Sequence, residues 1–279
     1  MPKSKTILVI QRAILYLILL SICLLAMFPV LWALSTSLKI ESQVVTFPPK
    51  WIPKPITFFR YVEVFVSKRF PIYLLNSIIV SVVSILLAVG TATLAGYSSA
   101  RFTFPGKEVI LFLILAATMI PGISIIIPLY ILSNRMHIYD TRAVLVLVHT
   151  GWRIPISTWL MRGFFESIPS EIEEAATIDG CSWFQAFYKV SLPLVTPGLG
   201  ASSILVFIYV WNDFLIGFTL TVSDRTKVAT VGLYEYLTMF GVEWGDLMAA
   251  VILTILPVLL LFFGLQKWFI QGLTRGAIK

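Results

Sequence analysis

The chain has 279 residues, of which 58% are hydrophobic and 13% are charged, and its mean hydropathy is +0.92. Ordinary soluble domains carry about twice that charged fraction, so the composition excludes a typical soluble protein and predicts a lipid bilayer as the solvent. The formal charge is +7, but Lys and Arg fall between long apolar runs, which excludes a nucleic-acid-binding face. We expect residues 1–279 to form a single transmembrane domain.

The first element predicted along the chain is an uncleaved membrane anchor. A short basic segment, Met1–Arg12, precedes an apolar stretch, Ala13–Leu34, that is too long for the core of a signal peptide. Cys23 lies within this stretch and Cys181 lies in a polar loop far along the chain. The two cysteines therefore predict neither a disulfide nor a metal site.

Six apolar stretches approach or exceed the roughly 20 residues that cross a hydrocarbon core. They are Ala13–Leu34, Tyr73–Ser99, Val109–Leu132, Ala143–Met161, Leu199–Thr221 and Leu247–Phe269, the fourth being interrupted by Arg153 and Pro155. A helix satisfies its own backbone hydrogen bonds in lipid, and the alternation typical of a membrane β-barrel is absent from the sequence. We therefore expect an all-α, polytopic membrane protein with six transmembrane helices.

The charges between these stretches do not assign an orientation. Six spans place both termini on one side of the membrane, and the positive-inside rule should then identify that side. Lys and Arg number ten on the side of the termini and ten on the other, with Arg153 inside a span. Orientation must come from another signal.

The loop Arg162–Gly198 predicts a short helix over Ser170–Asp179. Ser170 and Glu173 have the spacing of a capping box, and Gly180 is placed to end the helix with a positive φ. Acidic side chains in the first turn favour the positive end of the helix dipole; they are Glu171, Glu173 and Glu174. The expected helix is about two and a half turns long.

A second helical stretch, Ser182–Val190, follows in the same loop and is rich in aromatic residues. These are Trp183, Phe184, Phe187 and Tyr188. Pro193 and Pro197 are expected to end this stretch before the fifth span. Its aromatic residues fit either an amphipathic connector that lies on the bilayer or a docking surface.

The loop also carries a longer pattern. Glu174-Ala175-Ala176, three residues, Gly180, nine residues and then Val190-Ser191-Leu192-Pro193 resembles the EAA signature of binding-protein-dependent ABC-importer permeases, with Val190 where Ile is usual. Further segments resemble the carbohydrate branch of that family, of the maltose and multiple-sugar type: Asn76-Ser77, Ala100-Arg101-Phe102, Pro105-Gly106-Lys107, Met119-Ile120-Pro121, Pro128-Leu129-Tyr130, Tyr139-Asp140-Thr141, Trp159–Phe165, Trp211–Phe214 and Gly272–Lys279.

The resemblance implies a type I ABC-importer permease in the cell inner membrane, with the loop and both termini in the cytoplasm. It implies four partners of this chain: a second permease that completes the pore, two ATPase subunits that use ATP and Mg²⁺, and an extracytoplasmic binding protein. The expected function is the import of a sugar or oligosaccharide. The expected alternatives are a non-sugar solute and, in another class, a self-sufficient secondary transporter.

No catalytic motif is present in the sequence. A phosphate-binding loop is absent, since Gly106-Lys107 is followed by Glu108 and lacks the upstream glycine. The two histidines, His137 and His149, are isolated, and zinc-protease or nucleophile-elbow patterns are absent. We therefore expect no catalytic residue, no metal and no cofactor on this chain, which argues against a membrane-embedded enzyme.

Residues expected to couple this chain to an ATPase gather around Ser170–Asp179. The hypothesis is a coupling helix in which Ala175 and Ala176 permit close approach of a partner backbone and Glu174 pairs with a basic group of the partner. The complete predicted set is Ser170, Glu173, Glu174, Ala175, Ala176, Asp179, Gly180, Leu192 and Pro193.

Polar residues inside the spans are candidates for the solute pathway, because ionisable groups are costly in hydrocarbon. Asp213 with Asn212 is interpreted either as a gate or as an interhelical hydrogen bond. Arg153 is interpreted as lining an aqueous cavity, as pairing with Asp213, or as displaced toward the interface. Three further residues are candidates either for sugar contact or for packing: Asn76, Tyr209 and Trp211.

Two peripheral segments leave alternatives open. The tail Gln271–Lys279 is expected to be either disordered or a contact with the ATPases. The segment Ser35–Ile72, with Pro48, Pro49, Pro53 and Pro55, fits either a flexible loop or a compact cap that touches the binding protein.

Overall fold

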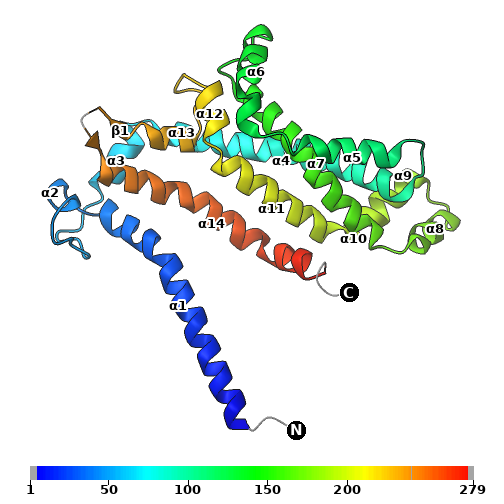
Figure 1. Ribbon diagram of the computed structural model, residues 1–279, viewed down its shortest axis with the longest axis horizontal. Helices are drawn as coiled ribbons and strands as arrows, with labels where there is room; N and C mark the ends of the chain where they lie inside the picture. Colours follow the sequence, from blue (N-terminus) through cyan, green and yellow to red (C-terminus); the bar gives the residue numbers. More distant parts are fainter. Residues whose placement is uncertain (1–4, 240, 276–279) are drawn as a thin grey trace. The chain divides into compact units, whose positions relative to one another are not determined.

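The computed structural model describes the backbone of residues 5–239 and 241–275, and the side chains of 11–239, 241–264 and 266. The described chain is helical almost throughout (Figure 1), which confirms the predicted all-α fold. The elements are, in order, α1 (Lys5–Ser37), α2 (Glu41–Val44), α3 (Phe59–Val66), α4 (Phe70–Arg101), α5 (Lys107–Ala117), α6 (Gly122–Arg135), α7 (Arg142–Glu166), α8 (Ser170–Ile178), α9 (Trp183–Ala186), the π-helix η1 (Phe187–Ser191), α10 (Leu192–Leu194), α11 (Thr196–Asn212), α12 (Leu215–Leu220), α13 (Ala229–Tyr234), β1 (Leu237–Thr238), β2 (Gly241–Val242) and α14 (Trp244–Arg275).

The prediction of six membrane spans is not confirmed as a number. Three described helices are long and apolar enough to cross a membrane, within Gln11–Ser37, Phe70–Arg101 and Trp244–Gly264. The number rises to five if each of two bent pairs forms one span: α5 with α6, bent by 91°, and the α9–α10 segment with α11, bent by 71°. The fourth predicted stretch lies in α7, a single helix of 25 residues that continues through Pro155.

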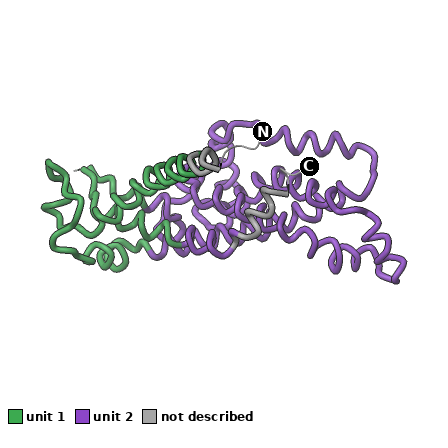
Figure 2. The backbone as a smooth tube through the Cα atoms, turned by 90° about the horizontal axis from the view of Figure 1, so that it is seen from below, with its two compact units in different colours: residues 1–70, 233–256 green, residues 71–232, 257–279 purple. Residues whose placement is uncertain are grey.

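Contacts divide the chain into two compact units, residues 1–70 with 233–256 and residues 71–232 with 257–279 (Figure 2). The expectation of one domain over 1–279 stays a prediction. The cytoplasmic-tail prediction lies partly outside the described residues: α14 continues to Arg275, and the last four residues are not described.

In the first unit, the buried Arg60 holds the segment between α1 and α4 together. Its guanidinium lies 2.5 Å from the Glu41 carboxylate and 2.9 Å from that of Asp246, and it donates to the carbonyl of Lys39 at 3.0 Å. A Cβ at Gly245 would lie 2.1 Å from Arg60 Cζ, so glycine is needed for this approach. The part of the segment in this unit is therefore compact rather than a free loop.

In the second unit, the main apolar cluster joins five helices. Buried side chains of α4, α7, α11, α12 and α13, with Val228 just before α13, form this cluster, namely Val80, Ala88, Val89, Val144, Leu145, Val146, Val206, Val210, Ile216, Leu220, Val228 and Val231. The backbones of α4 and α7 approach closely at Gly96, where a Cβ would lie 2.8 Å from Met161 Cβ. Small residues permit such close crossings of helices in lipid.

A second buried cluster lies where the loop between α7 and α11 meets α4 and α7. It contains Tyr97, Met161, Phe165, Phe187 and Val195. The Tyr97 ring is 4.6 Å from the Phe187 ring and 5.2 Å from the Phe165 ring, measured between centroids. This cluster includes Phe187 of η1, and α8 packs against η1 beside it.

Candidate functional site

The short helix α8 forms as predicted in length and at its C-terminal end. It spans nine residues, and Gly180 follows it with φ of +91°. The amide of Gly180 donates to the carbonyl of Thr177 at 3.0 Å, and the amide of Cys181 donates to that of Ala176 at 3.0 Å. A residue with positive φ lets the chain turn back over the last helical carbonyls, so the glycine ends the helix.

The predicted capping box at the start of α8 is wrong. The helix begins at Ser170 after Pro169, and no side chain caps it. The Glu173 side chain does not accept from the backbone amide of Ser170, because it is buried against Tyr97 and Arg101. A capping box is instead present at α9, where Ser182 accepts from the amide of Gln185 and Gln185 accepts from the amide of Ser182.

Glu173 anchors α8 to the last turn of α4. The residue is 1% exposed, and its carboxylate accepts from Arg101 Nε at 2.8 Å and from the Tyr97 hydroxyl at 3.0 Å. Arg101 also donates to the carbonyl of Ile168 at 3.0 Å, just before α8. Burying a charge is favourable only when it is paired and hydrogen-bonded, and both carboxylate oxygens of Glu173 meet that condition.

The opposite face of α8 is exposed and mixes acidic with small and apolar side chains. Ile178 is 86% exposed, although an isoleucine is normally buried. The other exposed residues are Ser170, Glu171, Ile172, Glu174, Ala175, Asp179 and Gly180, and Ala176 is half-buried. Seven of the nine predicted coupling residues thus lie on or beside α8; Ser170, Glu174, Ala175, Asp179 and Gly180 are exposed, whereas Glu173 is turned inward.

The aromatic stretch stays helical past Val190 and ends at Leu194, one residue after Pro193, where the chain bends by 71° into α11. The chain passes from α9 through the π-helix η1 into α10, which contains Pro193, while Pro197 lies in the first turn of α11. Proline is tolerated there because the first amides of a helix have no intrahelical acceptor. Leu192 is half-buried and Pro193 is exposed.

Asp213 lies at a break in the predicted fifth span. It follows the last residue of α11, and its carboxylate accepts from the amides of Ile216 and Gly217 at 3.1 and 3.2 Å. The aspartate therefore caps the first turn of α12. His149 Nε2 is 3.9 Å away, and the predicted pairing of Arg153 with Asp213 is not among the ion pairs of the described residues.

Arg153 instead stacks on Tyr209. Its Cζ lies 3.3 Å from the centroid of the Tyr209 ring, where α7 and α11 pack side by side (Figure 1). Tyr209 is 41% exposed, and Asn212, three residues further along α11, is also exposed. Trp211 is 4% exposed and stacks on Phe207, which places its ring in the core rather than on an open face.

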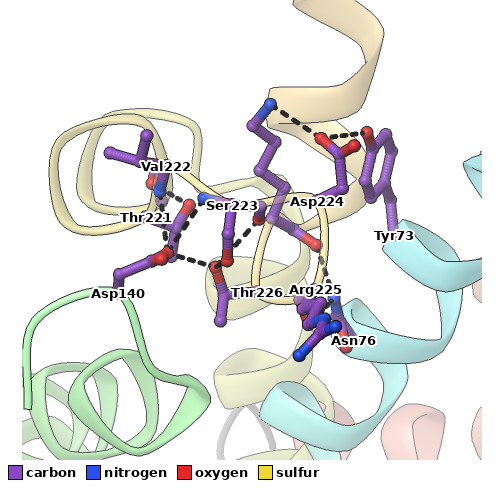
Figure 3. Close-up of polar contacts among 11 residues, drawn as sticks. Tyr73, Asn76, Asp140, Thr221, Val222, Ser223, Asp224, Arg225 and Thr226 are labelled. Atoms are coloured by element: carbon purple, nitrogen blue, oxygen red, sulfur yellow. Dashed lines mark hydrogen bonds and ion pairs between the residues drawn. The ribbon is translucent and has the colours of Figure 1, made fainter.

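Asn76 is buried and holds the loop after α12 in place. Its amide nitrogen donates to the carbonyls of Arg225 and Lys227 at 3.0 and 2.8 Å, and the nearby Tyr73 hydroxyl donates to Asp224 at 3.1 Å (Figure 3). These bonds occupy the donors of the Asn76 amide. These contacts favour the packing alternative for Asn76 over a sugar contact.

Asp140, in the turn before α7, holds the same loop by hydrogen bonds. The sequence did not predict this role. One carboxylate oxygen accepts from the amides of Val222 and Ser223 at 2.9 and 3.1 Å and from the Thr226 hydroxyl (Figure 3). Burial alone would raise the pKa of Asp140, but these hydrogen bonds outweigh it and lower the pKa below its usual value. With φ of +55°, Asp140 sits in a conformation that Asp and Asn tolerate better than most residues.

The sequence did not indicate Tyr97 and Arg101 as the partners of Glu173. Arg101 lies in a segment that resembles the carbohydrate branch, but no local pattern links it to a glutamate 72 positions later. Within residues 5–239 and 241–275, no group of three or more His, Cys, Asp or Glu residues is placed to hold a metal ion.

Comparison with known proteins identifies the family. Residues 88–275 match the family described as "Binding-protein-dependent transport system inner membrane component". The probable ABC transporter permease protein y4oR of Sinorhizobium fredii is 36% identical over 260 residues, covering 92% of this chain and 93% of that protein. The trehalose transport system permease protein SugB of Mycobacterium tuberculosis is 35% identical (91% and 93% covered), and the sulfoquinovosyl glycerol transport system permease protein SmoH of Agrobacterium fabrum is 33% identical (91% and 89%).

Solved structures agree with the fold. A crystal structure of a bacterial ABC transporter involved in the import of the acidic polysaccharide alginate matches with a TM-score of 0.81 at 24% identity, over 96% of this chain and 99% of that one. A second alginate transporter structure, in complex with an alginate pentasaccharide-bound periplasmic protein, matches with a TM-score of 0.66 at 17% identity, over 91% and 92%. The chain therefore belongs to the family of inner-membrane components of binding-protein-dependent transport systems, as a multi-pass permease subunit of an ABC importer.

Proposed function

We propose that this chain forms half of the translocation pore for a sugar or oligosaccharide and is driven by partner ATPases through α8. The sugar class is supported by relatives named for trehalose and sulfoquinovosyl glycerol transport. The observation that carries the coupling role is the division of α8 into two faces. Glu173 ties one face to α4, while Glu174, Ala175 and Ile178 leave the other open to a partner.

This division makes α8 a lever. A partner that grips the open face moves a rigid two-and-a-half-turn helix, and Glu173 passes the displacement to Arg101 and Tyr97 at the end of α4. The packing of Tyr97 against Phe165 and Phe187 passes it to α7 and η1. Such a joint shifts helices as packed bodies, which suits a switch between inward- and outward-facing access.

The energy for this cycle comes from other chains, because this sequence has no phosphate-binding loop. In our proposal, two ATPase subunits bind ATP and Mg²⁺ beneath the loop 162–198, a second permease completes the pore, and an extracytoplasmic protein delivers the solute. Both termini and α8 then lie in the cytoplasm. The chain itself binds no cofactor and does not hydrolyse ATP.

The coupling role is tested by Ala175→Trp in the complete importer. A bulky ring on the open face should block close approach of the ATPase, abolishing uptake and the stimulation of ATPase activity by sugar-loaded binding protein. Lys189→Trp is the control, since Lys189 is exposed in the same loop but lies on η1. Normal membrane levels with unchanged uptake in Ala175→Trp would refute the lever.

The orientation is tested with the native Cys181, which follows Gly180 and is half-exposed. After Cys23→Ser, a membrane-impermeant maleimide should label Cys181 in inside-out vesicles and leave it unlabelled in right-side-out vesicles. The reverse pattern would place α8 outside the cell.

A further inference from the structure

Arg153 carries an uncompensated positive charge halfway along α7. It is the twelfth of 25 residues, about 16 Å from the first residue of the helix at 1.5 Å per residue. Its buried Nε has no hydrogen-bond partner among the described residues. None of the ion pairs formed in the described part of the chain includes Arg153.

Asp213, the acid that the sequence suggested as a partner of Arg153, is engaged elsewhere. Asp213 spends one carboxylate oxygen on the amides of Ile216 and Gly217, and that oxygen is also the atom 3.9 Å from His149 Nε2. The other two arginines of α7 differ from Arg153: Arg162 pairs with Glu108 and Glu166, and Arg142 lies in the first turn and reaches Asn76 at 3.5 Å. Arg153 is thus the arginine of this helix that is far from its ends and lacks an acid among the described residues.

The contact with Tyr209 orients the guanidinium without neutralising it. A separation of 3.3 Å between Cζ and the ring centroid places the guanidinium against the face of the ring. Its N–H donors lie in the guanidinium plane and stay directed away from the ring, in the fork that matches a carboxylate. Tyr209 and Asn212 are exposed on the adjoining face of α11, together with Leu205 and Ile208, so this charge borders an open edge of mixed polarity.

A charge halfway along a 25-residue helix would be costly against lipid, because its side chain is too short to reach either end of the helix. We infer that Arg153, held by Tyr209, is a recognition site for the anionic group of a carbohydrate, a carboxylate or sulfonate, on the water-filled solute path. The inference rests on the proposed function as a sugar permease, and it narrows the solute class to acidic sugars. Charge-assisted, two-pronged hydrogen bonds from the guanidinium would supply the selectivity.

The first test measures the local charge at the exposed position 212. Asn212→Cys is introduced into the complete importer with Cys23 and Cys181 changed to Ser, and the chain is labelled with an anionic and a cationic methanethiosulfonate of similar size. The anionic reagent should be favoured by on the order of tenfold, because a charge in a confined aqueous site raises the local concentration of its counter-ion. Arg153→Gln should remove this preference, whereas Arg162→Gln on the same helix should preserve it.

The second test measures recognition by protection of the same cysteine. Digalacturonate should slow the labelling, while its dimethyl ester, which has the same size and no charge, should not. 6-Deoxy-6-sulfoglucose against glucose is the matched sulfonate pair. Arg153→Gln should abolish protection, Tyr209→Leu should weaken it several-fold, and Tyr209→Phe, which keeps the ring, should retain it.

Three results would overturn the inference. Failure of both reagents to react means that lipid or the second permease covers the site, and an unchanged reagent preference in Arg153→Gln means that a partner carboxylate neutralises the charge. Equal protection by charged and uncharged sugars means that the site does not bind the anionic group selectively. Labelling needs no ATP, so these results are independent of the Ala175→Trp experiment on coupling.

Discussion

The buried joint between α8 and α4 makes a quantitative prediction. Replacing Arg101 with Met leaves the Glu173 carboxylate, whose side chain is 2% exposed, with the Tyr97 hydroxyl as its remaining described donor. Removing one partner of a fully buried ion pair costs roughly 3–5 kcal/mol. The retained hydrogen bond and the 10% exposure of the Arg101 side chain reduce this, so we expect about 2 kcal/mol, or roughly thirtyfold in the opening of α8.

Opening is measured by thiol labelling of Ala186→Cys with Cys23 and Cys181 changed to Ser. Ala186 is 0% exposed at the end of α9, next to η1, and α8 packs against both elements, so a reagent reaches it only when the loop opens. Where opening and reclosing are fast relative to labelling, the rate reports the free energy of local opening. The control, Lys189→Met, removes a positive charge from an exposed site in the same loop.

A double variant separates charge from packing. In Arg101→Met with Glu173→Gln, no charge is buried and the amide oxygen can still accept from Tyr97, so most of the protection should return. The reasoning is refuted if Arg101→Met labels no faster than Lys189→Met, or if the double variant opens as readily as Arg101→Met alone.

Asp140→Asn should lower the melting temperature of the purified importer at pH 7 by the equivalent of about 2 kcal/mol, since hydrogen bonds to a charged acceptor are lost. Because the folded pKa of Asp140 is lowered, its stabilisation is present above the usual carboxyl range and is lost as pH falls below about 4, so the two melting curves should converge there. Gly96→Ala should destabilise by about 1–3 kcal/mol through the clash with Met161, whereas Gly90→Ala in the same helix, with nothing within 4 Å, should be neutral or stabilising by up to about 1 kcal/mol in denaturant melts. Gly180→Ala should cost about 1–2 kcal/mol from backbone strain alone, visible as faster labelling of Ala186→Cys.

Local chemistry determined which of these features could be predicted from sequence. Gly180 ends α8 because only a residue free to adopt positive φ does so at low cost, and that information is contained in a few neighbouring positions. Glu173 and Glu174 have the same side chain, but successive helical residues are rotated by about 100°, so one faces the bundle and the other faces solvent. Which of them is buried depends on Arg101, far away in sequence, and no local pattern contains it.

The length of the apolar stretches alone predicts the membrane spans. The helices of the structure depart from those stretches where a proline or a polar side chain adds a constraint. The third stretch bends by 91° before α6, which starts after Pro121, and the fifth ends at Asp213 because that carboxylate caps α12. Asn76 looked like a pathway residue because it is polar and begins a span, yet its partners are backbone carbonyls some 150 residues later. Such long-range bonds are visible only once the helices are packed.

The two sides of α8 should respond differently to ionic strength. The carboxylate of Glu173 meets its cation away from water, so mobile ions scarcely weaken that bond, while Glu171, Glu174 and Asp179 present their charges in solvent, where about 0.15 M salt already damps attraction beyond roughly 8 Å. Raising the salt concentration would thus weaken the binding of a basic partner to the exposed face of α8, while the Glu173–Arg101 ion pair still holds α8 to α4. Washing membranes with concentrated salt should remove the ATPase subunits and leave a permease that can bind them again at lower salt.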